Sequence, residues 1–357
     1  MQGQAPTTGR GGRPRASSRS SEAASGAAGA TPSRGTLAAG EKDARAQAPE
    51  ASSGAVREDV STLGAALSRS GACAIACEPT AEGILSAVGT GYLAHAGAAQ
   101  VRLVPLGACQ PRLGEEVVQG PSCARDETVA LARRVLRGFE RHVSEGCARA
   151  RSGRCPRRCA GSCVRRLLYA CASSSEGAPE VVHRYLRLAF ERGGAVRSAL
   201  QDPRVADLSA LALSVSGECE RTRQFVRFSR QEDGSFAASF SPRDDTIPLT
   251  SGYFASRLLD ERFYVLDPAH LVAAFHLPGR RDCGLVRLDA GEAASLAARR
   301  RDAPEEARVE ALWRHFYQCM ALPGRDRSQR GYDLRASWVP RRFWAGLPEL
   351  GEPLGTE

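Results

Sequence analysis

The stretch that decides the fold class is QFVRFSRQEDGSFAASFSP, which spans residues 224–242. Before it, apolar residues recur at the three- and four-residue spacing of amphipathic helices. Within it, two runs rich in aromatic and small residues flank Asp233-Gly234. Asp-Gly between such runs is a strong signal for the tight turn of a β-hairpin. The change of pattern predicts that helices come first and paired strands come later.

The sequence on both sides of this hairpin predicts the other elements. Helices are predicted at 80–95, 126–143, 181–194, 203–221, 247–259 and 309–321, from apolar positions at helical spacing. Short strands are predicted at 71–79 and 101–106, and a second strand pair at 262–279, turning at Asp267-Pro268. The predicted fold is α+β, a mainly helical domain with a small antiparallel sheet built from hairpins in the C-terminal half.

Composition divides the chain into a tail and one domain. Residues 1–70 are rich in Ala, Gly, Ser and Arg and contain no aromatic residue. Such a segment buries too little apolar surface to offset chain entropy, so we expect a disordered tail. Residues 71–355 are expected to form a single domain. The tail has no apolar core of a secretory signal, and the sequence has no apolar run of membrane-spanning length, so we expect a cytoplasmic protein with no membrane association.

Charge and cysteine content narrow the kinds of partner and site. The net charge is +9, which is compatible with an anionic partner such as DNA, although all basic residues except Lys42 are arginines and this bias alone says little. Residues 147–171 form a Cys- and Arg-rich stretch that we interpret as a local insert. Its cysteines are Cys147, Cys155, Cys159, Cys163 and Cys171. Their spacing permits either zinc ligation or packing along one helix face, and both interpretations stay open.

Two arginine-rich segments are candidates for contact with phosphate or a partner carboxylate. Around the first hairpin lie Glu218, Arg221 and Arg227, where Glu218 and Arg221 are also spaced for a local ion pair. The segment Pro323–Trp344 interleaves six arginines with four aromatic residues, a composition that suits backbone contacts plus base stacking. Its large aromatic residues also suit a closing segment that packs on the domain.

The order of the motifs resembles a known bacterial family. In chain order, the motifs are TAEGILSAVGTGY (80–92), RYLRLAFERGGAV (184–196), the Glu-x₂-Arg-x₃-Phe-Val-Arg-Phe run of 218–228, FYVLDPAH (263–270) and VPRRFW (339–344). They follow one another as in the family described as probable DNA metabolism protein, a domain of unknown function. The resemblance covers about residues 71–350. It implies DNA metabolism or repair beside a uracil-DNA-glycosylase-like protein, with a radical-SAM putative DNA repair protein as a further associate. Tyr253 and Glu220 stand where the family tends to have histidines.

The functional prediction is an accessory DNA-repair protein that acts by binding DNA or a protein partner, with no cofactor. Binding is assigned to Arg221, Arg227, Arg257, Arg325, Arg341, Arg342, Trp338 and Trp344, with Glu218, Asp267 and His270 as supporting polar residues. One alternative is a metal-dependent nuclease or base-processing enzyme. It would use Glu218, Asp244, Asp245, Asp267 or His270. A second alternative is a protein-binding scaffold that makes no contact with DNA.

Overall fold

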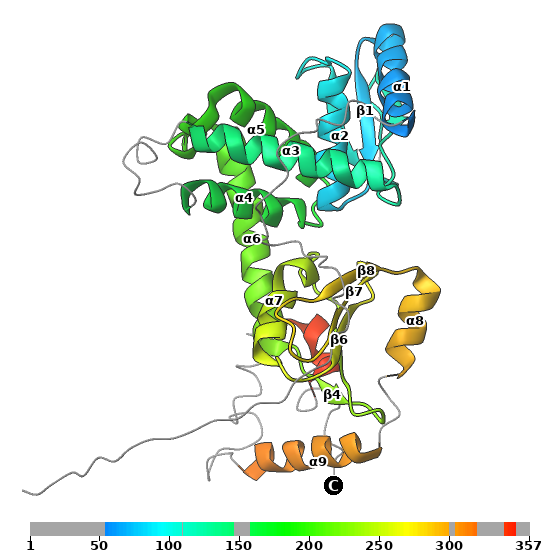
Figure 1. Cartoon of the computed structure of the whole chain (residues 1–357), viewed down its shortest axis with the longest axis vertical. Helices are drawn as coiled ribbons and strands as arrows, with labels where there is room; N and C mark the ends of the chain where they lie inside the picture. Colours follow the sequence, from blue (N-terminus) through cyan, green and yellow to red (C-terminus); the bar gives the residue numbers. More distant parts are fainter. Residues whose placement is uncertain (1–53, 109, 146–157, 300–303, 320–338, 348–357) are drawn as a thin grey trace, which may run out of the picture. The chain divides into compact units, whose positions relative to one another are not determined.

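The computed structural model describes residues 54–108, 110–145, 158–299, 304–319 and 339–347 (Figure 1). The helices are α1 (Gly54–Ser70), α2 (Ala81–Leu93), α3 (Asp126–Glu145), α4 (Arg158–Cys171), α5 (Ala178–Arg192), α6 (Pro203–Phe225), α7 (Ile247–Arg257), α8 (Ala290–Arg299) and α9 (Pro304–Cys319). The 3₁₀ helices are η1 (Gly193–Arg197) and η2 (Arg341–Gly346). The strands are β1 (Cys73–Cys77), β2 (Val101–Pro105), β3 (Glu116–Gln119), β4 (Ser229–Arg230), β5 (Phe236–Ser239), β6 (Phe263–Asp267), β7 (Val272–His276) and β8 (Gly284–Arg287).

The first sheet is parallel and small, with the strand order β2-β1-β3. Every residue of the central strand β1 is buried, as expected of a parallel strand covered on both faces. Helix α2 makes the crossover from β1 to β2, and its N-terminus is capped by Thr80, whose side chain accepts a hydrogen bond from the Gly83 amide at 3.0 Å. The strands predicted at 71–79 and 101–106 and the helix predicted at 80–95 are confirmed. Their parallel pairing has no local sequence signal.

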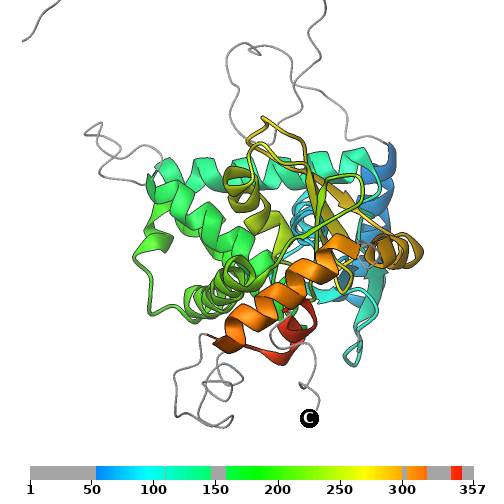
Figure 2. The same cartoon turned by 90° about the horizontal axis from the view of Figure 1, so that it is seen from below.

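Helices α3, α4 and α5 lie side by side next to this sheet (Figures 1 and 2). Their apolar faces meet in one core that contains Phe139, Leu167 and Tyr185, all fully buried. The ring centroids of Phe139 and Tyr185 are 5.9 Å apart. Helix α6 is 23 residues long, about 34 Å at 1.5 Å per residue. It packs on α4 and α5 and then continues to α7, so it joins the helical layer to the second sheet.

The second sheet is mixed, with the order β4-β5-β6-β7-β8. The hairpin predicted at Asp233-Gly234 is confirmed: β4 pairs antiparallel with β5, and Gly234 has a φ of 78°. The pair β6–β7 is also antiparallel, as predicted. The prediction of an antiparallel sheet is wrong for one ladder, because β5 and β6 run parallel. Helix α7 lies between these two strands in sequence and provides the connection that a parallel pair needs.

The C-terminal segment closes the second core. Val339, Phe343 and Leu347 are buried against this sheet, and the Phe343 ring stacks on Phe240 at 6.1 Å. Trp344 is partly buried and donates a hydrogen bond from Nε1 to the Val339 carbonyl oxygen at 2.9 Å. The sequence VPRRFW therefore acts as a packing clamp.

The structure differs from two predicted boundaries. The tail was expected to extend to residue 70, but Gly54–Ser70 forms α1, which buries Val56, Leu63 and Ala66. The average composition of residues 1–70 concealed this local helical spacing, and residues 1–53 lie outside the described part of the chain. The described portion of the predicted Cys- and Arg-rich insert, 158–171, is the core helix α4. Among the described residues, no helix is both long enough and apolar enough to cross a membrane.

Candidate functional site

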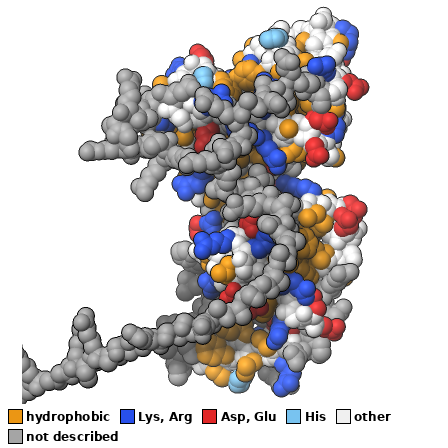
Figure 3. Space-filling view, in the orientation of Figure 1, with side chains coloured by type: hydrophobic (Ala, Val, Ile, Leu, Met, Phe, Trp, Pro, Cys, Tyr) orange, Lys and Arg blue, Asp and Glu red, His pale blue; other side chains and the backbone are white. Residues whose placement is uncertain are grey.

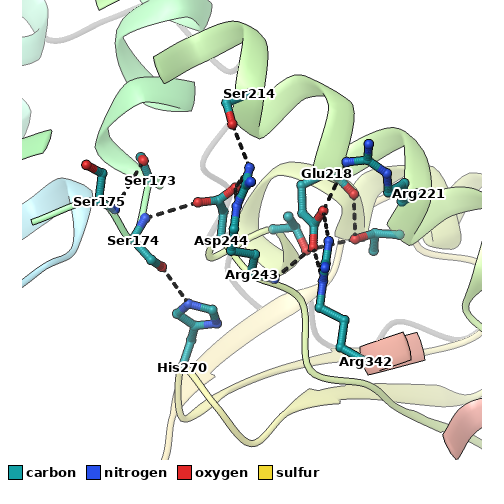
Figure 4. A network of polar contacts seen from close by, with 12 residues as sticks. Ser173, Ser174, Ser175, Ser214, Glu218, Arg221, Arg243, Asp244, His270 and Arg342 are labelled. Atoms are coloured by element: carbon teal, nitrogen blue, oxygen red, sulfur yellow. Dashed lines mark hydrogen bonds and ion pairs between the residues drawn. The ribbon is translucent and has the colours of Figure 1, made fainter. Parts of the chain in front are cut away.

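The centre of the candidate site is Glu218, a fully buried carboxylate on α6 (Figure 4). The Arg342 guanidinium binds it with two hydrogen bonds, Nε to Oε1 at 2.9 Å and Nη2 to Oε2 at 2.6 Å. Arg221, one helical turn further along α6, contributes a third bond from Nη1 to Oε2 at 3.3 Å. The backbone amide of Arg243 donates to Oε1 at 2.7 Å. The carboxylate is thus satisfied by donors from three separate segments.

These donors keep Glu218 ionised. Burial by itself would raise the pKa of the carboxyl group, but the Arg342 hydrogen bonds and the Arg243 amide outweigh burial, so the pKa of Glu218 is lowered. Arg342 belongs to η2, which the aromatic packing of Phe343 anchors on the second core. The ion pair therefore connects α6 to a segment 124 residues away in the chain.

A second buried carboxylate, Asp244, orients the Arg243 side chain. Its Oδ2 accepts hydrogen bonds from Arg243 Nε at 3.2 Å and Nη2 at 2.9 Å, and Nη2 also donates to Ser214 Oγ at 2.6 Å. The other carboxylate oxygen, Oδ1, accepts a bond from the backbone amide of Ser174 at 3.1 Å. Figure 4 shows that this connects the Glu218 cluster to the loop between α4 and α5.

The guanidinium groups of this network remain accessible from outside. The side chains of Arg221, Arg243 and Arg342 are 42%, 51% and 33% exposed, while the carboxylates beneath them are buried. On the face shown in Figure 3, Lys and Arg side chains (blue) gather in groups, with acidic side chains among them. A guanidinium held from behind by a carboxylate presents its remaining N–H groups in a fixed direction, an arrangement that suits bidentate contact with phosphate.

Asp267 and His270 lie in the turn between β6 and β7. Asp267 is fully buried, and its Oδ1 accepts hydrogen bonds from the backbone amides of Ala269 at 3.0 Å and His270 at 3.2 Å. Its Oδ2 is 2.6 Å from His270 Nδ1. On the other side of the ring, His270 Nε2 is 2.9 Å from the hydroxyl of Ser174. The turn therefore holds the imidazole between a buried carboxylate and a surface serine.

The other predicted site residues are dispersed. Arg227 was expected within a strand, but it lies in the connection between α6 and β4, where Nη1 donates to the Gln224 carbonyl oxygen at 2.9 Å. Arg257 is exposed in the last turn of α7. Arg341 is exposed beside Arg342, with its guanidinium 5.8 Å from the Trp344 ring. The predicted residues that lie outside the described part of the chain are Arg325 and Trp338.

Sequence reasoning named Glu218, Arg221 and Arg342, which the structure brings together, but it did not single out Ser174. A serine in the run Ser173-Ser174-Ser175 carries no sequence signal, because its partners are 70 and 96 residues away. Only the folded arrangement brings it to Asp244 and His270.

Two of the five candidate metal-ligating cysteines have side chains that the structure describes. Cys147, Cys155 and the side chain of Cys159 lie outside the described residues. Cys163 and Cys171 are buried in the core of the helical layer, and burial raises the pKa of both thiols. Among the described residues, no group of three or more His, Cys, Asp and Glu side chains is placed to hold a metal ion.

Residues 176–349 match a family model described as a domain of unknown function (DUF4130). This confirms the domain-of-unknown-function part of the predicted resemblance over those residues. No curated protein sequence matches the chain.

Two solved structures show a distant likeness. The first is RecJ in complex with Mg²⁺ from Thermus thermophilus, with 13% identity, a TM-score of 0.34, and coverage of 69% of this chain and 51% of that one. The chain therefore spans about half the length of that protein. The second is exonuclease RecJ bound to manganese, with 12% identity, a TM-score of 0.29, and coverage of 71% and 96%.

Proposed function

We propose that this chain is an accessory protein of DNA metabolism that binds the DNA phosphate backbone. One observation carries the proposal: two buried carboxylates, Glu218 and Asp244, orient the partly exposed guanidiniums of Arg221, Arg243 and Arg342. The three guanidiniums carry one more unit of charge than the two carboxylates. An anion that approaches the outer face meets a local excess of positive charge with fixed geometry.

The wider role rests on the motif resemblance described above. It supports a cytoplasmic DNA-repair setting, with a uracil-DNA-glycosylase-like protein and a radical-SAM putative DNA repair protein as associates. In this role the chain would supply DNA contact and leave the base chemistry to its partner. The scaffold and metal-dependent enzyme remain alternatives, and the experiment below separates the first of them from DNA binding.

The test is binding of the full chain to fluorescein-labelled single-stranded, duplex and uracil-containing DNA, followed by anisotropy across a salt series. The Arg221→Gln/Arg341→Ala variant removes two exposed guanidiniums while leaving the Arg342–Glu218 pair in place. We expect weaker binding to all sequences and a salt slope that falls by about 0.9 for each duplex phosphate that the variant no longer neutralises. The matched control is Arg133→Ala/Arg137→Ala, which removes the same charge from exposed positions of α3.

Binding that does not depend on salt, or the absence of binding by the folded chain, would refute the proposal and favour the scaffold. Equal weakening by the α3 control would show a general charge effect and remove the assignment to the Glu218 cluster. A preference for uracil-containing DNA would add lesion recognition to the role.

A further inference from the structure

Three side chains form a hydrogen-bonded series that runs from the surface into the interior, and the proposed function does not use it. Ser174 Oγ lies 2.9 Å from His270 Nε2, and His270 Nδ1 lies 2.6 Å from Asp267 Oδ2. Burial increases along the series: Ser174 is exposed, the His270 side chain is 19% exposed, and Asp267 is fully buried. This is the order of a nucleophile that substrate can reach, a base behind it and a buried carboxylate that orients the base.

The backbone holds the base and its carboxylate in this geometry. Asp267 accepts the amide of His270 with the oxygen that does not bind the imidazole, so one carboxylate fixes both the turn and the ring. The following residue, Leu271, has a φ of 52°. This left-handed conformation is energetically unfavourable for a residue such as leucine, which has a Cβ atom. Strain of this kind persists only where surrounding contacts determine the conformation.

The serine is also fixed, from a different segment. Its backbone amide donates to the buried carboxylate of Asp244 at 3.1 Å, and the Asp245 amide donates to the Ala172 carbonyl oxygen at 3.0 Å. Figure 4 shows Ser174 held on one side by Asp244 and facing the His270 ring on the other. The loop between α4 and α5 thus presents the hydroxyl to the imidazole from a defined position.

The electrostatics suit a general base. Burial raises the pKa of Asp267, and the hydrogen bond and charge of His270 oppose that rise. In its ionised form Asp267 accepts a hydrogen bond from Nδ1–H, which leaves the Nε2 lone pair of a neutral imidazole for the serine hydroxyl. Burial lowers the pKa of His270, but the hydrogen bond and charge of Asp267 outweigh burial, and Asp245 adds to this while Arg287 opposes it, so the pKa is raised. A more basic imidazole is a stronger acceptor for the serine proton.

We propose that Ser174 is a nucleophile for ester cleavage, with His270 as its general base and Asp267 as the positioning residue. Ser174 Oγ would add to the carbonyl carbon of a carboxylic ester while its proton passes to His270 Nε2. The alcohol leaves with that proton, and an acyl-serine remains. A water molecule then adds to the acyl carbon, giving one proton to His270, and the Ser174–acyl bond breaks to release the acid as the serine regains the proton.

The surroundings favour an ester that carries a negative charge. Arg287 pairs with Asp245 at 2.7 Å and donates to the His270 carbonyl oxygen at 3.4 Å, and its side chain is 44% exposed. Arg243 is held next to the serine loop by Asp244. Arg287 is therefore held at the His270 turn and Arg243 at the carboxylate that binds the Ser174 amide, and these two partly exposed guanidiniums would attract an anionic substituent on the acid portion.

The test is covalent labelling of the native full chain with a fluorophosphonate probe, in which the Ser174 Oγ–phosphorus bond forms and the phosphorus–fluorine bond breaks. A serine without a paired base does not react at a comparable rate. We expect one label per chain, mapped to Ser174 by peptide mass spectrometry. A chain that is denatured in urea before the probe is added should take no label. Ser174→Ala should abolish the label, and His270→Gln should slow labelling on the order of 100-fold or more.

Ser175→Ala is the matched control. Ser175 is an exposed neighbour in the same loop, and the substitution leaves the backbone groups of the loop in place, so we expect an unchanged labelling rate. A folded wild-type chain that takes no label, or a label that maps to another residue, overturns the proposal whatever the variants do. Full-rate labelling of His270→Gln also overturns it, because the serine would then react without its base.

Ester turnover gives the second measurement. The full chain should release p-nitrophenol from p-nitrophenyl hemisuccinate faster than from the neutral acetate, with a rate that rises with pH as His270 loses its proton. Asp267→Asn should lower this rate and shift the pH midpoint downward, which a merely structural residue would not do. Asp244 and Arg243 are shared with the proposed function, but Ser174, His270 and Asp267, the residues changed here, are not part of it, so loss of esterase activity in these variants should leave DNA binding unaffected.

Discussion

The stability of the fold should depend strongly on Arg342, although this arginine lies at the surface. Arg342→Ala removes two hydrogen bonds from Glu218 and leaves a carboxylate that is fully buried. Removing one partner of a buried ion pair costs about 3–5 kcal/mol, because the remaining charge loses its compensation. The substitution also takes away the ion pair that connects η2 to α6.

Two features of the structure lower the expected cost of Arg342→Ala. Arg221 and the Arg243 amide still donate to Glu218 in the variant, and the space left by a side chain that is one-third exposed admits water. We therefore expect a loss of stability at or just below the lower end of that range, about 2–3 kcal/mol. For a chain of this size that corresponds to a fall in Tm of roughly 3–5 °C.

The assay is urea unfolding of the full chain, followed by far-UV circular dichroism. Arg341→Ala is the matched control, since the neighbouring arginine has the same charge but lies over the Trp344 ring, 5.8 Å from its centroid. Its loss should cost less than about 1 kcal/mol. In the Glu218→Gln background, Arg342→Ala should cost at least about 1 kcal/mol less than it does in the wild type, because no charge is left uncompensated.

A loss for Arg342→Ala within about 0.5 kcal/mol of wild type would refute the reasoning, since that is the range of an ordinary surface substitution. An equal loss for Arg341→Ala would show that η2 responds to any change of charge. Additive effects of the two substitutions would show that Glu218 and Arg342 do not stabilise each other in solution.

Three further outcomes are expected. Because the pKa of Glu218 is lowered in the folded protein, its stabilising effect is present above its unfolded pKa of about 4.3 and is lost as pH falls through the lower folded value. The urea midpoints of wild type and Glu218→Gln should therefore draw together as pH falls below about 4.3, and a constant gap would contradict this. A methyl group at Gly83, in the first turn of α2, would collide with the Glu78 carbonyl oxygen, so Gly83→Ala should cost about 1–3 kcal/mol. Gly64 lies in the interior of α1 with open space around its Cβ position, so Gly64→Ala should stabilise by about 0.5–1 kcal/mol; thermal melts showing the reverse order would be inconsistent with the packing. Burial raises the pKa of Cys77 to about 12, so its thiol should resist Ellman's reagent until the chain unfolds in urea, and rapid native labelling at that residue would be evidence against a buried β1.

The sequence by itself determined the local elements. Thr80 caps α2, Asp202-Pro203 opens α6, and Asp233-Gly234 turns a hairpin, because each signal acts within a few residues of backbone. The aromatic residues of VPRRFW also predicted a packed segment, since large rings are rarely left exposed.

The tertiary structure alone decided which strands and polar groups meet. The parallel ladders β1–β2 and β5–β6, and the helix α1 within a compositionally biased segment, depend on long-range packing that local pattern does not encode. The same holds for Ser174 beside His270, 96 residues apart, and for Arg342 beside Glu218, 124 residues apart. Hydrogen bonds and ion pairs act over about 3 Å of space regardless of sequence distance. The sequence supplies these groups, but only the fold selects their partners.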